Sequence, residues 1–310
     1  MKAILFPGQG SQVVGMGSEF YNNFSSVKEI FNSADEKLKF KLSKIILEGP
    51  EDQLKLTQNT QPAILTVSYA IFKILKEEFN YNFENTKYFA GHSLGEYSAL
   101  LCAGSLSFED ALYLLFERGK SMQEAVPVGK GGMLAVLGSE NEEIEDCIKK
   151  IKSKGVCEIA NDNAPGQIIV SGNIELIQEL QNILKENKKK SIMLPVSAPF
   201  HCSLMNAAAT NMKSKIENVN FIKPNYEIIA NVTASPTNDP AEMKKLLVEQ
   251  IYSKVRWRES ILYMTNQNIT EYLEIGPGKV LTGLVKRILP STNSSSINSI
   301  EDIKNITNES

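Results

Sequence analysis

Short apolar runs alternate with longer amphipathic segments along most of this chain. The apolar runs predict strands at residues 3–6, 88–90, 227–232 and 270–275. Helices are predicted at 63–75, 96–103, 108–125, 203–216 and 241–252, with another ending at 288. Residues 59–62 predict a helix start with Pro62 near the first turn, whereas the serine- and asparagine-rich stretch 291–296 predicts a loop. Strands that alternate with helices are typical of an α/β domain with a parallel sheet.

The pattern changes between residues 129 and 197. Six elements are predicted there in the order strand, helix, strand, strand, helix, strand, at 131–137, 141–152, 156–160, 167–170, 174–186 and 191–196. That order is the ferredoxin-like β-α-β-β-α-β pattern. We therefore expect a large, hydrolase-like α/β domain formed by residues 1–128 and 198–310, with residues 129–197 inserted in it as a ferredoxin-like α+β subdomain.

The composition is that of an ordinary globular protein, since 42% of the 310 residues are hydrophobic and 22% are charged. A net charge of −3 argues against a nucleic-acid-binding surface. No apolar run is long enough to predict a membrane span, and the first strand leaves no room for a signal peptide. The four cysteines lack C-x-x-C spacing, so neither a zinc site nor a disulfide framework is indicated. We expect a cytoplasmic protein that binds no nucleic acid, membrane or metal.

The most informative motif is Gly91-His92-Ser93-Leu94-Gly95, which lies between a predicted strand and a predicted helix. A G-x-S-x-G sequence in this position is the nucleophile-elbow pattern, in which a sharp turn exposes the serine hydroxyl above the sheet. The motif alone recurs by chance, so its strand-elbow-helix context is what makes it informative. The alternative is a glycine-flanked turn in which Ser93 only caps the following helix.

A serine nucleophile needs a base near neutral pH, and the chain has only two histidines, His92 and His201. His92 is adjacent to Ser93, so its side chain points the other way and it is a poor candidate. His201 is the remaining one, against the alternative that it packs in its loop for structural reasons. Cys202 follows it directly and is interpreted as a packing residue.

Arg118 is predicted to lie in the middle of an apolar helix face, together with Ala111, Leu115 and Met122. Burying an unpaired arginine is costly, because its guanidinium must leave water. Periodicity leaves two interpretations open. One is an internal salt bridge or a guanidinium that reaches solvent; the other is a cation that binds a substrate carboxylate.

Taken together, these motifs resemble the malonyl-CoA:acyl carrier protein transacylase family. The resemblance rests on residues 6–12 (FPGQGSQ), 91–97 (GHSLGEY), Arg118, 199–201 (PFH), 255–257 (VRW) and 274–278 (EIGPG). It runs from the first strand to about Leu289, in the order and spacing of the family. Each motif alone is weak, but the set is specific.

The resemblance implies that Ser93 is acylated by malonyl-CoA and that His201 is the general base and acid. It implies that the backbone N–H groups of Gln9 and Leu94 form the oxyanion hole. Gln250 corresponds to the residue whose main-chain carbonyl orients the histidine, so no third acidic residue is needed.

The resemblance further implies that Arg118 forms a bidentate pair with the free malonyl carboxylate. Gln61 and Met122 would line the acyl pocket. Phe200, beside the base, resembles family members that prefer malonyl to branched extender units.

The implied partners are malonyl-CoA or CoA and an acidic acyl carrier protein, with no cofactor and a monomeric enzyme. Candidates for a basic docking patch are Lys188, Lys189, Lys190, Lys279, Lys286 and Arg287. Two alternatives stay open at this point. A serine hydrolase or thioesterase would share the elbow but would not need a buried Arg118, and a non-catalytic docking module would have only the fold.

Overall fold

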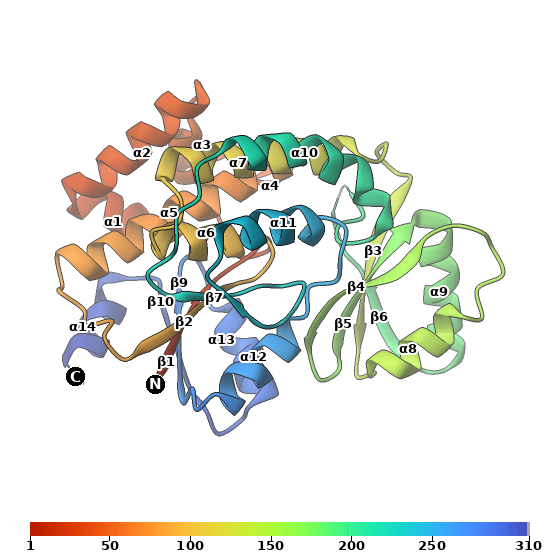
Figure 1. The fold of residues 1–310 in the computed structure, drawn as a ribbon. Helices are drawn as coiled ribbons and strands as arrows, with labels where there is room; N and C mark the ends of the chain where they lie inside the picture. Colours follow the sequence, from red (N-terminus) through yellow and green to blue (C-terminus); the bar gives the residue numbers. More distant parts are fainter. Residues whose placement is uncertain (197, 309–310) are drawn as a thin grey trace.

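The computed structural model describes residues 1–196 and 198–308. Within these residues the chain forms two sheets, one of six strands and one of four (Figure 1). All strands of the smaller sheet lie between residues 131 and 193. The expected domain limits at 197 and 310 fall outside the described residues, so these boundaries stay a prediction.

The larger sheet has the strand order β10-β9-β1-β2-β7-β8. Its strands pair in parallel except β8, which is antiparallel to β7. Their bounds are β1 Lys2–Phe6, β2 Thr86–Gly91, β7 Glu227–Ile229, β8 Pro236–Thr237, β9 Glu271–Ile275 and β10 Asn293–Ile297. Parallel strands need long crossover connections, and helices supply them here.

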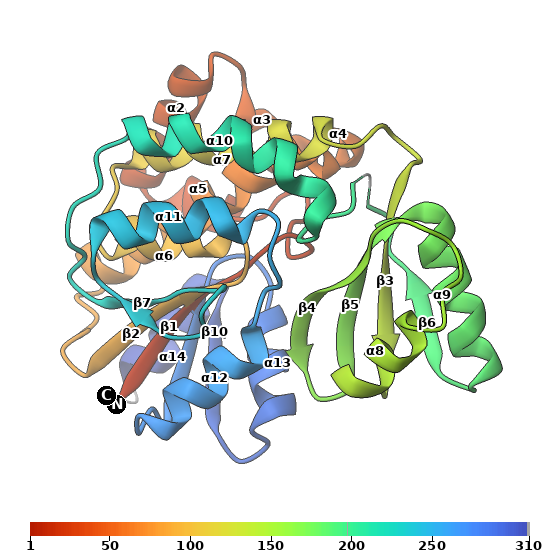
Figure 2. The same cartoon turned by 45° about the vertical axis from the view of Figure 1, so that its right-hand side comes forward.

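Helices cover both faces of this sheet (Figures 1 and 2). Ile4 and Phe6 of β1 belong to the core shared with α5, α6 and α7, whereas Ala3 and Leu5 face α12 and α13. This alternation follows from the two-residue period of a strand. The helices are α1 Ser18–Asn23, α2 Ser25–Leu38, α3 Leu42–Glu48, α4 Glu51–Lys55, α5 Thr57–Glu77, α6 Gly95–Cys102, α7 Phe108–Glu124, α10 Asn206–Asn218, α11 Pro240–Gln250, α12 Trp257–Asn266, α13 Val280–Ile288 and α14 Ile300–Asn308, with a short 3-10 turn at Ser203–Met205.

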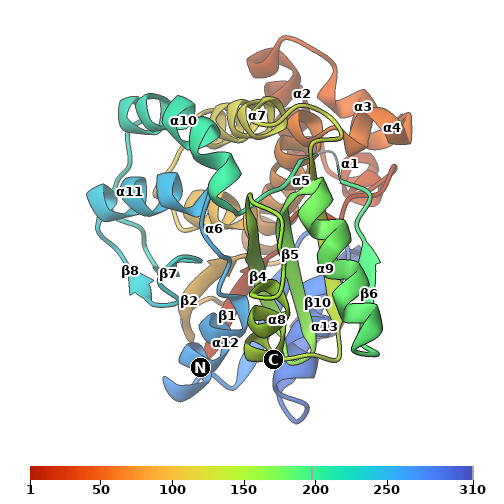
Figure 3. The same ribbon diagram turned by 90° about the vertical axis from the view of Figure 1, so that its right-hand side faces the viewer.

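The smaller sheet has the order β4-β5-β3-β6, and all of its pairings are antiparallel. Its elements are β3 Gly131–Leu137, α8 Asn141–Ile148, β4 Cys157–Ala164, β5 Gln167–Asn173, α9 Ile174–Glu186 and β6 Lys190–Met193. Both helices lie on the face turned away from the larger sheet (Figure 3). The predicted ferredoxin-like order is confirmed, and β4 is the strand nearest the rest of the molecule (Figure 2).

Several local predictions were wrong. The stretch expected to be a loop at 291–296 contains β10, whose serines carry little apolar signal because an edge strand is held by backbone pairing with β9. Helix α5 begins at Thr57, so Pro62 lies inside it rather than in its first turn. Helix α8 ends at Ile148 instead of 152. Residues 18–55, for which no element was predicted, form four helices.

Candidate active site

A cavity of about 200 Å³ lies between the two parts of the molecule, and residues of both parts line it. Seven of the nine site residues expected from the sequence line it, and only Leu94 and Gln250 do not. The lining residues are Gln9, Gln61, His92, Ser93, Arg118, Met122, Met133, Asn161, Asn163, Ile169, Leu194, Val196, Phe200 and His201. This volume suits a short acyl group rather than a long hydrocarbon chain.

The elbow at Ser93 is a tight turn between the end of β2 and the start of α6. Ser93 has a φ of 52°, which lies in the left-handed region that non-glycine residues rarely adopt. A Cβ at Gly91 would lie 1.9 Å from the carbonyl carbon of Gly95, and one at Gly95 would lie 2.2 Å from the Phe6 oxygen. Only glycine fits at either position. The Asn231 side chain secures the turn, because its Oδ1 accepts from the Ser93 N–H (2.7 Å) and its Nδ2 donates to the Gly91 carbonyl (2.7 Å).

Ser93 and His201 form a hydrogen-bonded pair, with 2.7 Å between Oγ and Nε2. The other ring nitrogen of His201, Nδ1, lies 2.8 Å from the Gln250 main-chain carbonyl. A carbonyl only accepts, so Nδ1 carries the proton and Nε2 is left to accept the proton of Ser93. The geometry expected for a serine and its base is present, and the acceptor behind the histidine is a carbonyl rather than a carboxylate.

Burial, followed by the nearby positive charge of Arg118, lowers the pKa of His201 to about 3. The imidazole is therefore neutral at pH 7 and able to take up a proton. Cys202 is buried, and burial raises the pKa of its thiol to about 11, which fits a packing residue rather than a nucleophile.

Arg118 is 1% exposed and lies on the inner face of α7. Its Nη2 donates to Ser93 Oγ (3.1 Å) and to Gln250 Oε1 (2.8 Å), and its Nη1 donates to Gln61 Oε1 (2.8 Å). Its guanidinium carbon lies 5.7 Å from the centre of the Tyr97 ring. In the described part of the chain no carboxylate forms an ion pair with it. The sequence left open the possibility of an internal salt bridge to Arg118. Instead, the neutral amide oxygens of Gln61 and Gln250 accept hydrogen bonds from its guanidinium.

The backbone amides of Gln9 and Leu94 lie where β1 and β2 end. Neither N–H donates to an acceptor within residues 1–196 and 198–308. Leu94 immediately precedes α6, so its amide belongs to the set of free donors at a helix N-terminus. These two groups are available to a negatively charged oxygen near Ser93.

The remaining expected residues also line the cavity. Gln61 and Met122 are each 1% exposed and contact each other, with Gln61 Nε2 lying 3.8 Å from the Met122 sulfur. Phe200 precedes His201 and also lines the cavity. His92 is not the base for Ser93; its Nε2 donates to Asn163 Oδ1 (2.8 Å).

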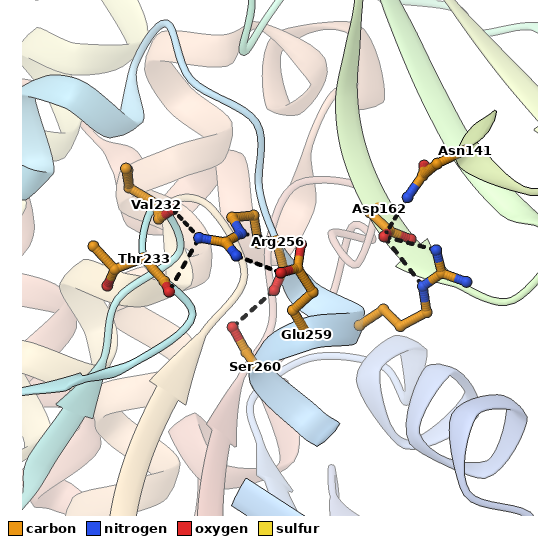
Figure 4. Close-up of polar contacts among 8 residues, drawn as sticks. Asn141, Asp162, Val232, Thr233, Arg256, Glu259 and Ser260 are labelled. Carbon is orange, nitrogen blue, oxygen red and sulfur yellow. Dashed lines mark hydrogen bonds and ion pairs between the residues drawn. The ribbon is translucent and has the colours of Figure 1, made fainter. Parts of the chain in front are cut away.

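Strand β4 forms the wall of the cavity on the side of the smaller sheet. Asn161 and Asn163 line the cavity, while Asp162 between them contacts Arg258 and Asn141 instead (Figure 4). Asp162 Oδ2 accepts from Arg258 Nε (3.1 Å) and Nη2 (2.9 Å), and from Asn141 Nδ2 (2.8 Å). This partly buried cluster ties α12 of the larger part to β4 and α8 of the smaller part.

The neighbouring Arg256 stabilises the same region from within the larger part. Its Nη1 donates to the carbonyls of Val232 and Thr233, each at 3.2 Å, and its guanidinium pairs with Glu259 (Figure 4). Val255, which directly precedes Arg256, is also joined to β4, because the Asp162 N–H donates to its carbonyl (3.0 Å). The VRW motif thus lies at the junction of the two sheets.

Sequence reasoning missed Asn161, Asn163, Asn231 and Glu96 as site residues. Asn231 could have been found from its place near the carboxyl end of the strand predicted at 227–232, where ligand sites form in α/β sheets. Asn161 and Asn163 of β4 could not have been found in this way, because no local sequence pattern indicates which face of the inserted sheet contacts the elbow.

The expected basic patch is split between the two parts. Lys188 to Lys190 lie at the edge strand β6, where Lys189 pairs with Glu143. Lys279, Lys286 and Arg287 lie at the two ends of α13.

The described residues also bear on two other features, a metal site and a membrane-spanning helix. No cluster of three or more histidine, cysteine, aspartate or glutamate side chains there could hold a metal ion. No helix among those residues has both the length and the hydrophobicity needed to span a membrane.

Residues 4–308 match the family model described as the acyl transferase domain, and the chain belongs to this family. It is 44% identical over 288 residues to the malonyl CoA-acyl carrier protein transacylase of Bacillus subtilis, covering 92% of this chain and 90% of that protein. It superposes on the crystal structure of the acyl-carrier-protein-S-malonyltransferase of Bartonella henselae with a TM-score of 0.96 and 41% identity, over 99% of this chain and 98% of that one. A malonyl-transacylase solved in complex with its type II PKS acyl-carrier protein gives a TM-score of 0.95 and 37% identity, over 100% and 99% of the two chains.

Proposed function

We propose that this protein transfers a malonyl group from malonyl-CoA to the phosphopantetheine thiol of an acyl carrier protein, through a malonyl ester on Ser93. The observation that carries the proposal is the position of Arg118. Its guanidinium lies 3.1 Å from Ser93 Oγ, deep in the protein, and only amide and hydroxyl oxygens accept its hydrogen bonds in the described part of the chain. A substrate with a free carboxylate near its reacting carbonyl supplies the missing negative charge.

In the first half-reaction Ser93 Oγ attacks the thioester carbonyl carbon while His201 Nε2 takes the hydroxyl proton. The developing oxyanion accepts hydrogen bonds from the amides of Gln9 and Leu94, and one such donor is worth about 10² to 10³ in rate. The C–S bond then breaks, and the proton on His201 passes to the departing CoA sulfur. The second half-reaction runs in reverse with the carrier thiol as nucleophile, so the enzyme returns to its starting state.

The other expected residues have supporting roles in this proposal. The Gln250 carbonyl keeps the His201 ring in the tautomer that accepts at Nε2. Arg118 binds the malonyl carboxylate with both Nη groups, and Gln61, Met122 and Phe200 enclose the acyl group.

The relative named malonyl CoA-acyl carrier protein transacylase, and the malonyl-transacylase solved with its acyl-carrier protein, support malonyl-CoA as the donor and an acyl carrier protein as the acceptor. We place the enzyme in the cytoplasm, as a monomer that supplies extender units for fatty-acid synthesis. Of the two basic groups, we favour Lys279, Lys286 and Arg287 for contact with the acidic carrier, because α13 belongs to the same part as Ser93.

The test is a transfer assay with malonyl-CoA and purified holo acyl carrier protein, in which malonyl-carrier and free malonate are measured together. We expect malonyl-carrier to accumulate with little malonate. Malonate without malonyl-carrier would favour a serine hydrolase or thioesterase, and no turnover of either kind would favour a non-catalytic docking module.

A further inference from the structure

Glu96 is a buried carboxylate in the first turn of α6, and none of the steps above uses it. It is 3% exposed, and its Oε2 accepts from the Asn231 backbone N–H (3.0 Å) and from Gln250 Nε2 (2.8 Å). Burying an ionisable group costs free energy, so we expect a role for Glu96 that offsets this cost. The partners of Glu96 belong to Asn231 and Gln250, the two residues whose side chains hold the elbow and the arginine.

The Gln250 side-chain amide has only one workable orientation in this environment. Its Nε2 faces Glu96 Oε2 and the Ser93 carbonyl (3.0 Å), while its Oε1 accepts from Arg118 Nη2 (2.8 Å). Rotating the amide by 180° would place N–H groups against the guanidinium and an oxygen against the carboxylate. Both contacts would be repulsive, so Glu96 selects the orientation in which an oxygen faces Arg118.

We propose that Glu96 is a positioning residue that fixes the amide of Gln250 and, through it, the guanidinium of Arg118 for the substrate carboxylate. The inference rests on the proposed function, and it explains why an amide stands between the two charges. A carboxylate in direct contact with Arg118 would satisfy the cation and compete with the substrate. An indirect contact through Gln250 orients the guanidinium of Arg118 and leaves its positive charge available to the substrate carboxylate.

The role requires an acceptor oxygen rather than a negative charge. Burial raises the pKa of Glu96 to about 7, against the opposing effect of its hydrogen bonds with Asn231 and Gln250 and of the Arg118 charge. In either protonation state one oxygen can accept from Gln250. A glutamine at this position keeps such an oxygen, whereas an alanine does not.

The experiment measures kcat/KM for acylation of Ser93 by malonyl-CoA and by acetyl-CoA, and compares the ratio between variants. We expect Glu96→Ala to lower the malonyl-to-acetyl ratio by about tenfold or more, and Glu96→Gln to stay within about threefold of wild type. The matched control is Glu274→Ala. Glu274 is equally buried, but it accepts from Leu281 and Thr282 at the start of α13, so its loss should lower the thermal midpoint without changing the ratio.

Gln250→Ala provides a second test that does not depend on the folding of Glu96→Ala. It should lower the ratio by a similar factor, and adding Glu96→Ala to it should cause no further loss of the ratio. An unchanged malonyl-to-acetyl ratio in Gln250→Ala or Glu96→Ala would overturn the inference. So would a tenfold loss of this ratio in Glu96→Gln, or a loss in Glu274→Ala equal to that in Glu96→Ala. If the wild-type enzyme showed no preference for malonyl-CoA over acetyl-CoA, the proposed function would be overturned as well. If wild type has this preference and Glu96→Ala and Gln250→Ala retain it, only the positioning role is overturned.

Discussion

The guanidinium of Arg118 donates a hydrogen bond to the hydroxyl of Ser93 across 3.1 Å. Arg118 comes from α7 and Ser93 from the turn before α6, and the contact is partly buried. A cation in this position serves two purposes. In the proposed mechanism it selects a substrate with a carboxylate next to its thioester. After burial, which has the larger effect, its charge also lowers the pKa of the neighbouring His201.

Replacing Arg118 with alanine should lower kcat/KM for malonyl-CoA by two or more orders of magnitude. The malonyl carboxylate would then be buried without its partner, which costs roughly 3 to 5 kcal/mol. Acetyl-CoA has no carboxylate, so its slower reaction should suffer much less. Steady-state kinetics with both thioesters measures the difference.

The matched control for this variant is Lys120→Ala, which removes an exposed cation from the same helix. It should leave both rates near wild type. Equal losses for malonyl and acetyl groups in Arg118→Ala would remove the carboxylate-binding role of Arg118 from the mechanism.

His201 should stay neutral throughout the range from pH 6 to pH 8. Burial lowers the pKa of His92 as well as that of His201, which falls to about 3. Because the unfolded chain takes up these protons near pH 6.5, the stability contributed by a neutral His201 is complete above pH 6.5. It is lost progressively as the pH falls from 6.5 toward 3.

NMR of ¹⁵N-labelled histidine measures this directly, with His201→Ala to assign the two signals. The spectra should show the neutral tautomer with the proton on Nδ1 of His201. A His201 midpoint near 6.5 in the folded protein would contradict the environment described here.

Arg258→Ala should destabilise the protein by about 3 kcal/mol, because it leaves the buried Asp162 without its cation. It should also raise KM for malonyl-CoA several-fold, since Asn161 and Asn163 on either side of Asp162 line the cavity. Chemical denaturation and steady-state kinetics provide the two measurements.

The control for this variant is Lys149→Ala, which breaks an exposed ion pair with Asp146 on α8. It should change neither quantity measurably. An unchanged KM in a destabilised Arg258→Ala would show that the contact stabilises the fold without shaping the cavity.

Much of the fold could be predicted from local pattern. The elbow was recognisable because Gly91 and Gly95 both lie within two residues of the serine, although only Gly91 is required by a contact inside the turn and Gly95 is required by its contact with Phe6 of β1. The order of the inserted subdomain followed from its alternating strands and amphipathic helices, whose periodicity is local. The resemblance to a family supplied Gln250, whose main-chain role no side-chain reasoning could reveal.

The failures have a physical reason in common. Strand β10 is held by backbone pairing with β9, so its serines gave no apolar pattern. Glu96 accepts from Gln250 and Asn231, which are 154 and 135 residues away in the chain. Such contacts depend on how the helices and strands pack together, and a single sequence does not show that arrangement.

The most direct test of the account is mass spectrometry of the intact and peptide-digested protein after incubation with malonyl-CoA alone. We expect one malonyl group per chain, carried by the peptide with Ser93, absent from Ser93→Ala and removed by holo acyl carrier protein. A malonyl adduct on another residue, or one that persists in Ser93→Ala, would contradict it.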